Sequence, residues 1–174
     1  KGSGAGQFLV DSVDEGLVNK ISFTGSTPVG KMIGEVCGRN LVSCSLELGG
    51  KNPLVVMPSA NIENAVEGAY WAAFGTAGQR CTSLGNLILH KDIYEEFMDK
   101  FMAKVKETKI GDSLRNDDVL YGSMLSEKYA SDFLRDLGMC ETDGATKLWG
   151  EGKITNENKP ENFQGDASEG AYMW

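Results

Sequence analysis

Histidine is almost absent from this sequence, because its 174 residues include a single histidine, His90. The four cysteines, Cys37, Cys44, Cys81 and Cys140, contain no Cys-x-x-Cys pair. A zinc site would therefore lack closely spaced ligands, and we expect no metal. An even number of cysteines permits disulfides, but the cysteine content is too low for a disulfide-based scaffold. This usage is typical of a reducing compartment.

Basic residues and long apolar runs are also scarce. The chain has 17 Lys and Arg against 25 Asp and Glu, which gives a net charge of −8. This acidic balance argues against nucleic acid or an anionic membrane surface as a partner. No apolar run approaches the roughly 20 residues of a membrane helix, and residues 1–7 lack a signal-peptide pattern. We expect a cytoplasmic protein, although composition does not distinguish the cytoplasm from an organelle matrix.

Strand-like and helix-like stretches alternate over the first 140 residues. The expected strands are 20–24, 41–48, 53–57 and 84–90. Two expected helices begin after N-cap residues, Thr27 and Asn61. A third begins at a capping box of Asp92 and Glu95 and is closed by Gly111. A fourth begins at Met124. This order predicts an α/β fold with mostly parallel sheets and flanking helices. Residues 141–174 hold seven acids and three lysines, and we expect a surface loop outside the core.

Two glycine-containing motifs are candidates for phosphate binding. Residues 25–30, Gly-Ser-Thr-Pro-Val-Gly, join an expected strand to an expected helix. A helix N-terminus offers free N–H groups and the positive end of the helix dipole. An ordinary capped turn is the simpler interpretation of this motif alone. Residues 2–6 nearly match G-x-G-x-x-G, but Gln7 replaces the last glycine, so a flexible terminus is the simpler interpretation there.

Glu47 and Cys81 are the candidate reactive side chains. Glu47 ends an expected strand before a Gly-Gly turn and is well placed to project into a cleft, although most glutamates are solvated surface acids. Cys81 lies in a loop rich in hydrogen-bond donors, where the neighbouring Arg80 would favour the thiolate. The alternative is a buried, inert thiol. His90 lies at the far end of a strand from Cys81, which argues against a Cys-His dyad.

Three motifs in order, F-T-G-S-T-x-x-G, L-E-L-G-G-K-N-P and G-Q-R-C-T, together resemble the aldehyde dehydrogenase superfamily. The separation of 34 residues between Glu47 and Cys81 agrees with that family's spacing. The resemblance covers about residues 1–137. One departure is Thr76, which stands where the family usually has asparagine.

The resemblance implies specific roles for the motif residues. Cys81 would be the nucleophile, and Glu47 the general base that activates water. NAD or NADP would bind at the turn and helix start of residues 25–30, at the end of the strand 41–48 and near the glycine-rich start of the chain. These cofactor-binding candidates are Gly25, Ser26, Thr27, Pro28, Val29, Gly30, Leu48 and Gly6.

The resemblance also implies a reaction and an incomplete fold. A small-molecule aldehyde would be oxidised to a carboxylic acid through a thiohemiacetal and a thioester. Family members are much longer than this chain and usually form homo-oligomers, dimers or tetramers. We therefore expect residues 1–46 to be the end of a dinucleotide-binding domain and residues 47–174 the start of a catalytic domain. The 174-residue chain alone is expected to be inactive.

Three alternative functions stay open. A coenzyme-A-acylating semialdehyde dehydrogenase would share most motifs, although Glu47 favours water over coenzyme A as the acyl acceptor. A cysteine hydrolase would use Cys81 but needs a better placed histidine than His90. A non-catalytic, truncated or structural module of the same fold is the third alternative.

Overall fold

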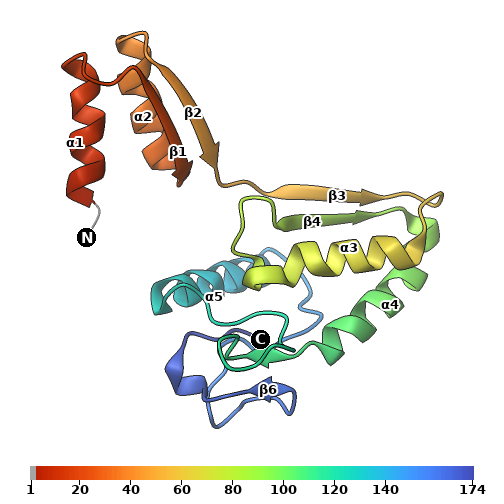
Figure 1. The fold of residues 1–174 in the computed structure, drawn as a ribbon. Coiled ribbons are helices and arrows are strands. Elements are labelled where there is room, and N and C mark those ends of the chain that lie inside the picture. The colour runs from red at the N-terminus through yellow and green to blue at the C-terminus, as the bar shows by residue number, and fades with distance from the viewer. Residues whose placement is uncertain (1–2) are drawn as a thin grey trace. The chain divides into compact units, whose positions relative to one another are not determined.

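The computed structural model describes residues 3–174, so Gly2 of the glycine-rich motif lies outside the described residues. The chain forms two compact units, Lys1–Gly50 and Lys51–Trp174 (Figure 1). Each unit contains a ladder of two parallel strands with a helix in the connection between them. The structure thus confirms the predicted α/β fold with parallel sheets and flanking helices, and each sheet described has two strands.

The first unit consists of α1 (Ser3–Asp14), β1 (Lys20–Gly25), α2 (Thr27–Arg39) and β2 (Ser43–Leu48). Strands β1 and β2 pair in parallel, from Lys20 opposite Ser43 to Gly25 opposite Leu48. Parallel strands require a crossover connection, and α2 provides it. The core between helices and strands consists of buried apolar side chains: Val10, Val13, Ile21, Ile33, Val36 and Cys37.

The expectation of a flexible terminus at the glycine-rich start is wrong from Ser3 onward, because α1 begins there. Glycine lowers helix propensity, but most helical stability in proteins comes from packing of an apolar face. Val10 and Val13 supply that face and are buried in the core shared with α2. The predicted helix after residue 26 is confirmed, although its N-cap is Ser26 and not Thr27.

The central part of the second unit consists of β3 (Asn52–Val56), α3 (Ile62–Phe74), the 3₁₀ turn η1 (Gly75–Gly78) and β4 (Leu84–Leu89). Strands β3 and β4 pair in parallel. The predicted Asn61 cap is confirmed, because its side chain accepts a hydrogen bond of 2.9 Å from the Asn64 N–H. The following α4 (Tyr94–Glu107) buries its predicted face, Phe97, Phe101 and Val105, in one core with Val56, Val66 and Ala69.

The ends of α4 differ from the prediction. A short 3₁₀ turn, η2 (Lys91–Ile93), precedes α4, and its cap is His90, whose Nδ1 accepts from the Asp92 N–H at 3.3 Å. Helix α4 ends at Glu107, while Gly111 belongs to the short strand β5 (Ile110–Gly111) and does not close the helix. The last helix, α5 (Glu127–Thr142), begins three residues after Met124.

Part of the segment 141–174 lies in the core of the second unit, so the expectation of a surface loop outside the core is wrong for that part, while residues 141–148 are exposed. Strand β6 (Phe163–Gln164) pairs in parallel with β5, and the 3₁₀ turn η3 (Ala167–Glu169) follows. Ile154, Phe163 and Tyr172 are buried together with Ile110. These apolar residues are sparse and widely spaced in the sequence, so composition alone conceals that they converge on β5.

No helix among residues 3–174 combines the length and the apolar character that a membrane crossing requires.

The C-terminal segment gives a pH-dependent prediction at Asp166. The Asp166 carboxylate accepts hydrogen bonds from Asn156 Nδ2 at 2.7 Å, from Ser168 Oγ at 2.7 Å and from Ser168 N–H at 2.9 Å. These bonds, that of Asn156 first, lower the pKa of Asp166 from its usual 3.8 to about 2. A lowered carboxyl pKa stabilises the fold above the unfolded pKa, and this contribution disappears as the pH falls through the folded pKa.

We therefore expect Asp166→Asn to flatten the fall in stability between about pH 4 and about pH 2. The measurement is the thermal unfolding midpoint across that range, compared with the natural protein and with Asp143→Asn at the exposed end of α5. Parallel curves for the natural protein and Asp166→Asn would contradict the prediction.

Candidate active site

The carboxyl ends of β1 and β2 gather several predicted site residues in the first unit. The ladder places Thr24 opposite Glu47 and Gly25 opposite Leu48. Because the strands are parallel, these residues lie at the same edge of the sheet. Ligands of open α/β sheets bind outside this edge. Glu47 is exposed there, and Leu48 is half-buried.

The turn after β1 leaves the start of α2 open. Ser26 has extended backbone angles, φ −75° and ψ 146°, and its side chain makes no capping hydrogen bond. Pro28, in the first turn of α2, has no N–H to satisfy, and the other first-turn N–H groups have no partner within the helix. Residues 25–29 are exposed. The hydroxyl of Ser26 and the first-turn N–H groups are thus positioned to meet an anion.

Gly30 and Leu48 contact one another closely. A Cβ atom on Gly30 would lie 2.5 Å from Leu48 Cδ2, so the Leu48 side chain would have to shift to admit any larger residue there. Gly30 is buried, and this packing explains the glycine without a ligand. Gly6 lies on the exposed side of α1, where a Cβ would meet nothing within 4 Å. The cofactor role of each of these two glycines stays a prediction.

Cys81 is exposed in the second unit, on a turn between η1 and β4. The Ser83 N–H donates to the Arg80 carbonyl oxygen at 3.1 Å, and the Arg80 N–H donates to Ser83 Oγ at 3.2 Å. From the neighbouring strand β3, Asn52 Nδ2 donates to the carbonyl oxygens of Cys81 at 2.7 Å and Ser83 at 2.9 Å. We call residues 80–83 the cysteine turn.

Gln79 and Arg80 tie the cysteine turn to other elements. Gln79 Oε1 accepts from the Leu125 N–H at 2.8 Å, which links it to the segment before α5. Arg80 Nη2 donates to the Trp71 carbonyl oxygen at 3.1 Å, and its guanidinium carbon lies 5.4 Å from the centre of the Trp71 ring. A Cβ on Gly75 would lie 2.7 Å from the same nitrogen. The charge of Arg80 is therefore engaged by the end of α3.

The residues that precede the cysteine turn have left-handed backbone angles. Thr76, Ala77 and Gly78 have φ values of 58°, 54° and 67°. Glycine adopts this region freely, and asparagine tolerates it, but a β-branched residue there is strained. Thr76, where the related family usually has asparagine, is therefore the residue in this run least suited to its conformation.

We expect Thr76→Asn to raise the free energy of unfolding by about 1 kcal/mol, since a non-glycine residue in such a region costs about 1–3 kcal/mol. The two hydrogen bonds that Thr76 receives, from Gln79 N–H and Gln79 Nε2, use its main-chain oxygen and persist. Denaturant unfolding tests this, with Thr146→Asn in an exposed loop of negative φ as the matched control. A Thr76→Asn protein no more stable than Thr146→Asn would contradict it.

The remaining cysteines occupy different environments. All four thiols are free, so the structure contains no disulfide within the described residues. Cys37 is buried, and burial raises the pKa of its thiol, with a smaller contribution from Cys44. Cys140 is exposed on α5. Among residues 3–174, no group of three or more His, Cys, Asp or Glu side chains is arranged to hold a metal ion.

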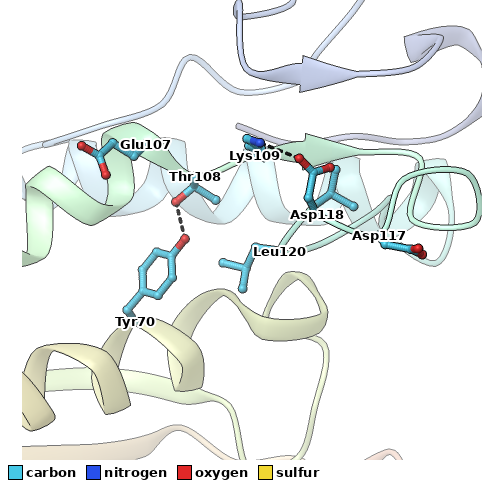
Figure 2. Close-up of a pocket in the computed structure, with 8 residues that line it drawn as sticks. Tyr70, Glu107, Thr108, Lys109, Asp117, Asp118 and Leu120 are labelled. Atoms are coloured by element: carbon cyan, nitrogen blue, oxygen red, sulfur yellow. Dashed lines mark hydrogen bonds and ion pairs between the residues drawn. The ribbon is translucent and has the colours of Figure 1, made fainter.

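A separate hollow lies in the second unit and contains no predicted site residue. Figure 2 shows Tyr70, whose hydroxyl lies 2.8 Å from Thr108 Oγ1, and Lys109, whose ammonium pairs with Asp118 at 2.5 Å. The polar groups of these four residues are therefore engaged in pairs within the hollow.

Asn52 is the residue of the site that the sequence did not single out. Its signal is present in L-E-L-G-G-K-N-P, where an amide side chain begins a strand before proline. The motif does not reveal the partners of Asn52, because Cys81 and Ser83 lie about 30 residues further along the chain.

A model of the aldehyde dehydrogenase family matches residues 1–165, so the chain belongs to that family. Alpha-ketoglutaric semialdehyde dehydrogenase of Bacillus subtilis is 37% identical over 155 residues, which cover 89% of this chain and 31% of that protein. D-glyceraldehyde dehydrogenase (NADP(+)) of Picrophilus torridus is 41% identical over 117 residues, 67% of this chain and 23% of that protein.

A solved structure, PnpE in complex with nicotinamide adenine dinucleotide, superposes with a TM-score of 0.78 at 39% identity. The match covers 86% of this chain and 30% of that structure. The chain thus spans about a third or less of the length of the relatives it matches.

Proposed function

We propose that the protein to which this chain belongs oxidises a small-molecule aldehyde to a carboxylic acid, with NAD or NADP as the oxidant. The observation that carries the proposal is the exposed Cys81 thiol on a turn held by hydrogen bonds, within a chain of the aldehyde dehydrogenase family. The names of the matched relatives, which include an NADP(+) enzyme and a complex with NAD, support the substrate class and the cofactor.

The start of α2 supplies groups that fit a cofactor pyrophosphate. The turn at residues 25–29 is exposed, the Ser26 hydroxyl is not used as a cap, and the first-turn N–H groups lack helical partners. Gly25 and Leu48 lie beside this turn at the sheet edge. We assign Gly25, Ser26, Thr27 and Val29 to direct cofactor contact, with Pro28, Gly30 and Leu48 shaping the turn.

Cys81 carries the covalent chemistry in this proposal. Its thiolate attacks the aldehyde carbon, and the carbonyl oxygen becomes a tetrahedral oxyanion. The Cys81 N–H donates to no acceptor among residues 3–174 and is available to stabilise that charge. NAD or NADP, when bound, accepts the hydride that leaves the same carbon, and the acyl group remains on Cys81 as a thioester.

Glu47 completes the cycle as general base. Its carboxylate takes a proton from water, the resulting hydroxide attacks the thioester carbon, and the Cys81 thiolate leaves as the carboxylic acid is released. The exposed position of Glu47 at the carboxyl edge of β2 gives its carboxylate access to water.

The proposal extends to the organisation of the protein. The first unit would be the end of a dinucleotide-binding domain, and the second the start of the catalytic domain. Glu47 and Leu48 pair with β1, so by packing they belong with the first unit, which ends at Gly50. A homo-oligomeric assembly, dimer or tetramer, and a cytoplasmic location are further parts of the proposal and rest on the family resemblance and composition.

Replacing the nucleophile should abolish turnover. We expect Cys81→Ala, in the full natural reading frame, to lower aldehyde-dependent NAD(P)H formation by roughly three orders of magnitude or more. Cys140→Ala removes another exposed thiol and should leave the rate unchanged. An aldehyde panel with each cofactor, followed by absorbance, makes the comparison. Equal rates in the natural protein and Cys81→Ala would exclude the proposed nucleophile.

Removing the base should separate the two half-reactions. Glu47→Gln is expected to give one equivalent of NAD(P)H rapidly, and then a steady rate lower by about 10²–10⁴-fold, because thioester hydrolysis loses its general base. Glu35→Gln on the exposed side of α2 is the control. Product analysis with and without coenzyme A tests the acylating alternative, which predicts an acyl-coenzyme A product and an undiminished rate for Glu47→Gln.

A further inference from the structure

The side chain of Asn52 connects strand β3 to two residues of the cysteine turn, Cys81 and Ser83. It is the first residue of β3 and pairs with Leu84, the first residue of β4. Its half-buried side chain therefore lies beside the chain that enters β4. The Nδ2 atom donates to the Cys81 and Ser83 carbonyl oxygens at 2.7 and 2.9 Å. Carbonyl oxygens only accept, so the amide must present its NH₂ group to them.

A bulge in the ladder places Asn52 at this position. Asn52 pairs with Leu84 but Pro53 pairs with Asn86, so Gly85 is the extra residue. A Cβ on Gly85 would lie 3.0 Å from the Lys51 Cα and 3.1 Å from its carbonyl carbon. The absence of a side chain at Gly85 lets the backbone before Asn52 approach β4. Bulges of this kind re-aim side chains and are common beside active sites.

The hydrogen bonds fix the peptide groups on both sides of Cys81. The Arg80 carbonyl accepts from the Ser83 N–H at 3.1 Å, and this carbonyl shares a planar peptide with the Cys81 N–H. The N–H therefore points in the opposite direction, away from the Ser83 N–H. On the other side of Cys81, the carbonyl is held by Asn52. Among residues 3–174, the Asn52 bond is the only one that reaches the Cys81 carbonyl from outside the turn.

We propose that Asn52 is a positioning residue that holds the backbone of Cys81, and so directs its thiol and its N–H toward the reacting aldehyde. The inference rests on the proposed function, because the benefit of fixed geometry is realised in the reaction at Cys81. Asn52 itself touches neither substrate nor cofactor in this account. Its amide acts through the Cys81 and Ser83 carbonyl groups.

The test compares Asn52→Leu, which has a similar shape but no donors, with Asn86→Leu on the neighbouring strand, in the full natural reading frame. Asn86 is exposed and lies opposite Pro53. Turnover is divided by the amount of folded protein whose Cys81 reacts with iodoacetamide. Mass spectrometry measures this amount. We expect Asn52→Leu to lower kcat per modifiable Cys81 by about 10–100-fold, because small displacements of a reacting group are costly. KM should change by less than about threefold, since substrate binding is retained.

Two further variants separate positioning from folding. Asn52→Gln keeps an amide donor and should exceed Asn52→Leu in per-site kcat by at least about threefold. Asn52→Ala carries the same comparison if Asn52→Leu does not fold. A merely structural role would lower the unfolding midpoint or the modifiable fraction and leave the per-site kcat within twofold of the natural protein. That result would overturn the proposal.

An activity-independent readout distinguishes this proposal from the proposed function. Amide hydrogen exchange across residues 79–86 should quicken at least about tenfold in Asn52→Leu, and not in Asn86→Leu, because the turn loses the two hydrogen bonds that Asn52 donates. If the natural protein oxidises no aldehyde, the proposed function fails, and exchange alone decides whether Asn52 holds the turn. Unchanged exchange in Asn52→Leu would overturn the positioning role whatever the activity.

Discussion

Parallel strand pairing is the constraint on which the site depends. Two parallel strands cannot be joined by a tight hairpin, so each unit inserts a helix between its paired strands. In the first unit this brings Gly25 and Leu48 to one edge, although 23 residues separate them in the chain. In the second unit the same rule brings the start of β3 beside the start of β4. Asn52 therefore reaches the carbonyl groups of Cys81 and Ser83, and the connecting helix determines which turns become neighbours.

Local sequence patterns predict the helices and strands whose signals lie within their own residues, such as an N-cap or an apolar face. The β-branched and apolar runs gave all four long strands, the Asn61 cap marked the start of α3, and the spacing of Phe97, Phe101 and Val105 gave the buried face of α4. Helix α1 and the C-terminal segment were not predicted. Both owe their structure to distant contacts, of Val13 with α2 and of Phe163 with Ile110, which no window of sequence contains.

The sequence predicts those residues of the candidate site that belong to recognisable motifs. Cys81, Glu47 and the turn at residues 25–30 stand out as residue types in a recognisable order. What the motifs do not contain is the set of supports around Cys81. The role of Asn52 depends on the bulge at Gly85, and the engagement of Arg80 with Trp71 depends on how α3 ends. Both are products of tertiary packing: the sequence shows that Arg80 is next to Cys81 in the chain, but not that its guanidinium contacts Trp71.

The strain before Cys81 and the bonds around it are best understood together. In the left-handed run Thr76 to Gly78, the two residues other than glycine, Thr76 and Ala77, cost conformational free energy that the unfolded segment would not bear. It is held by Gln79 to the segment before α5, by Arg80 to α3 and by Asn52 to β3. These anchors come from three different elements, so no single neighbour determines the shape of the turn. A thiol can thus be exposed to solvent while its backbone is fixed, which is the combination that a nucleophile needs when it must be both accessible and precisely oriented.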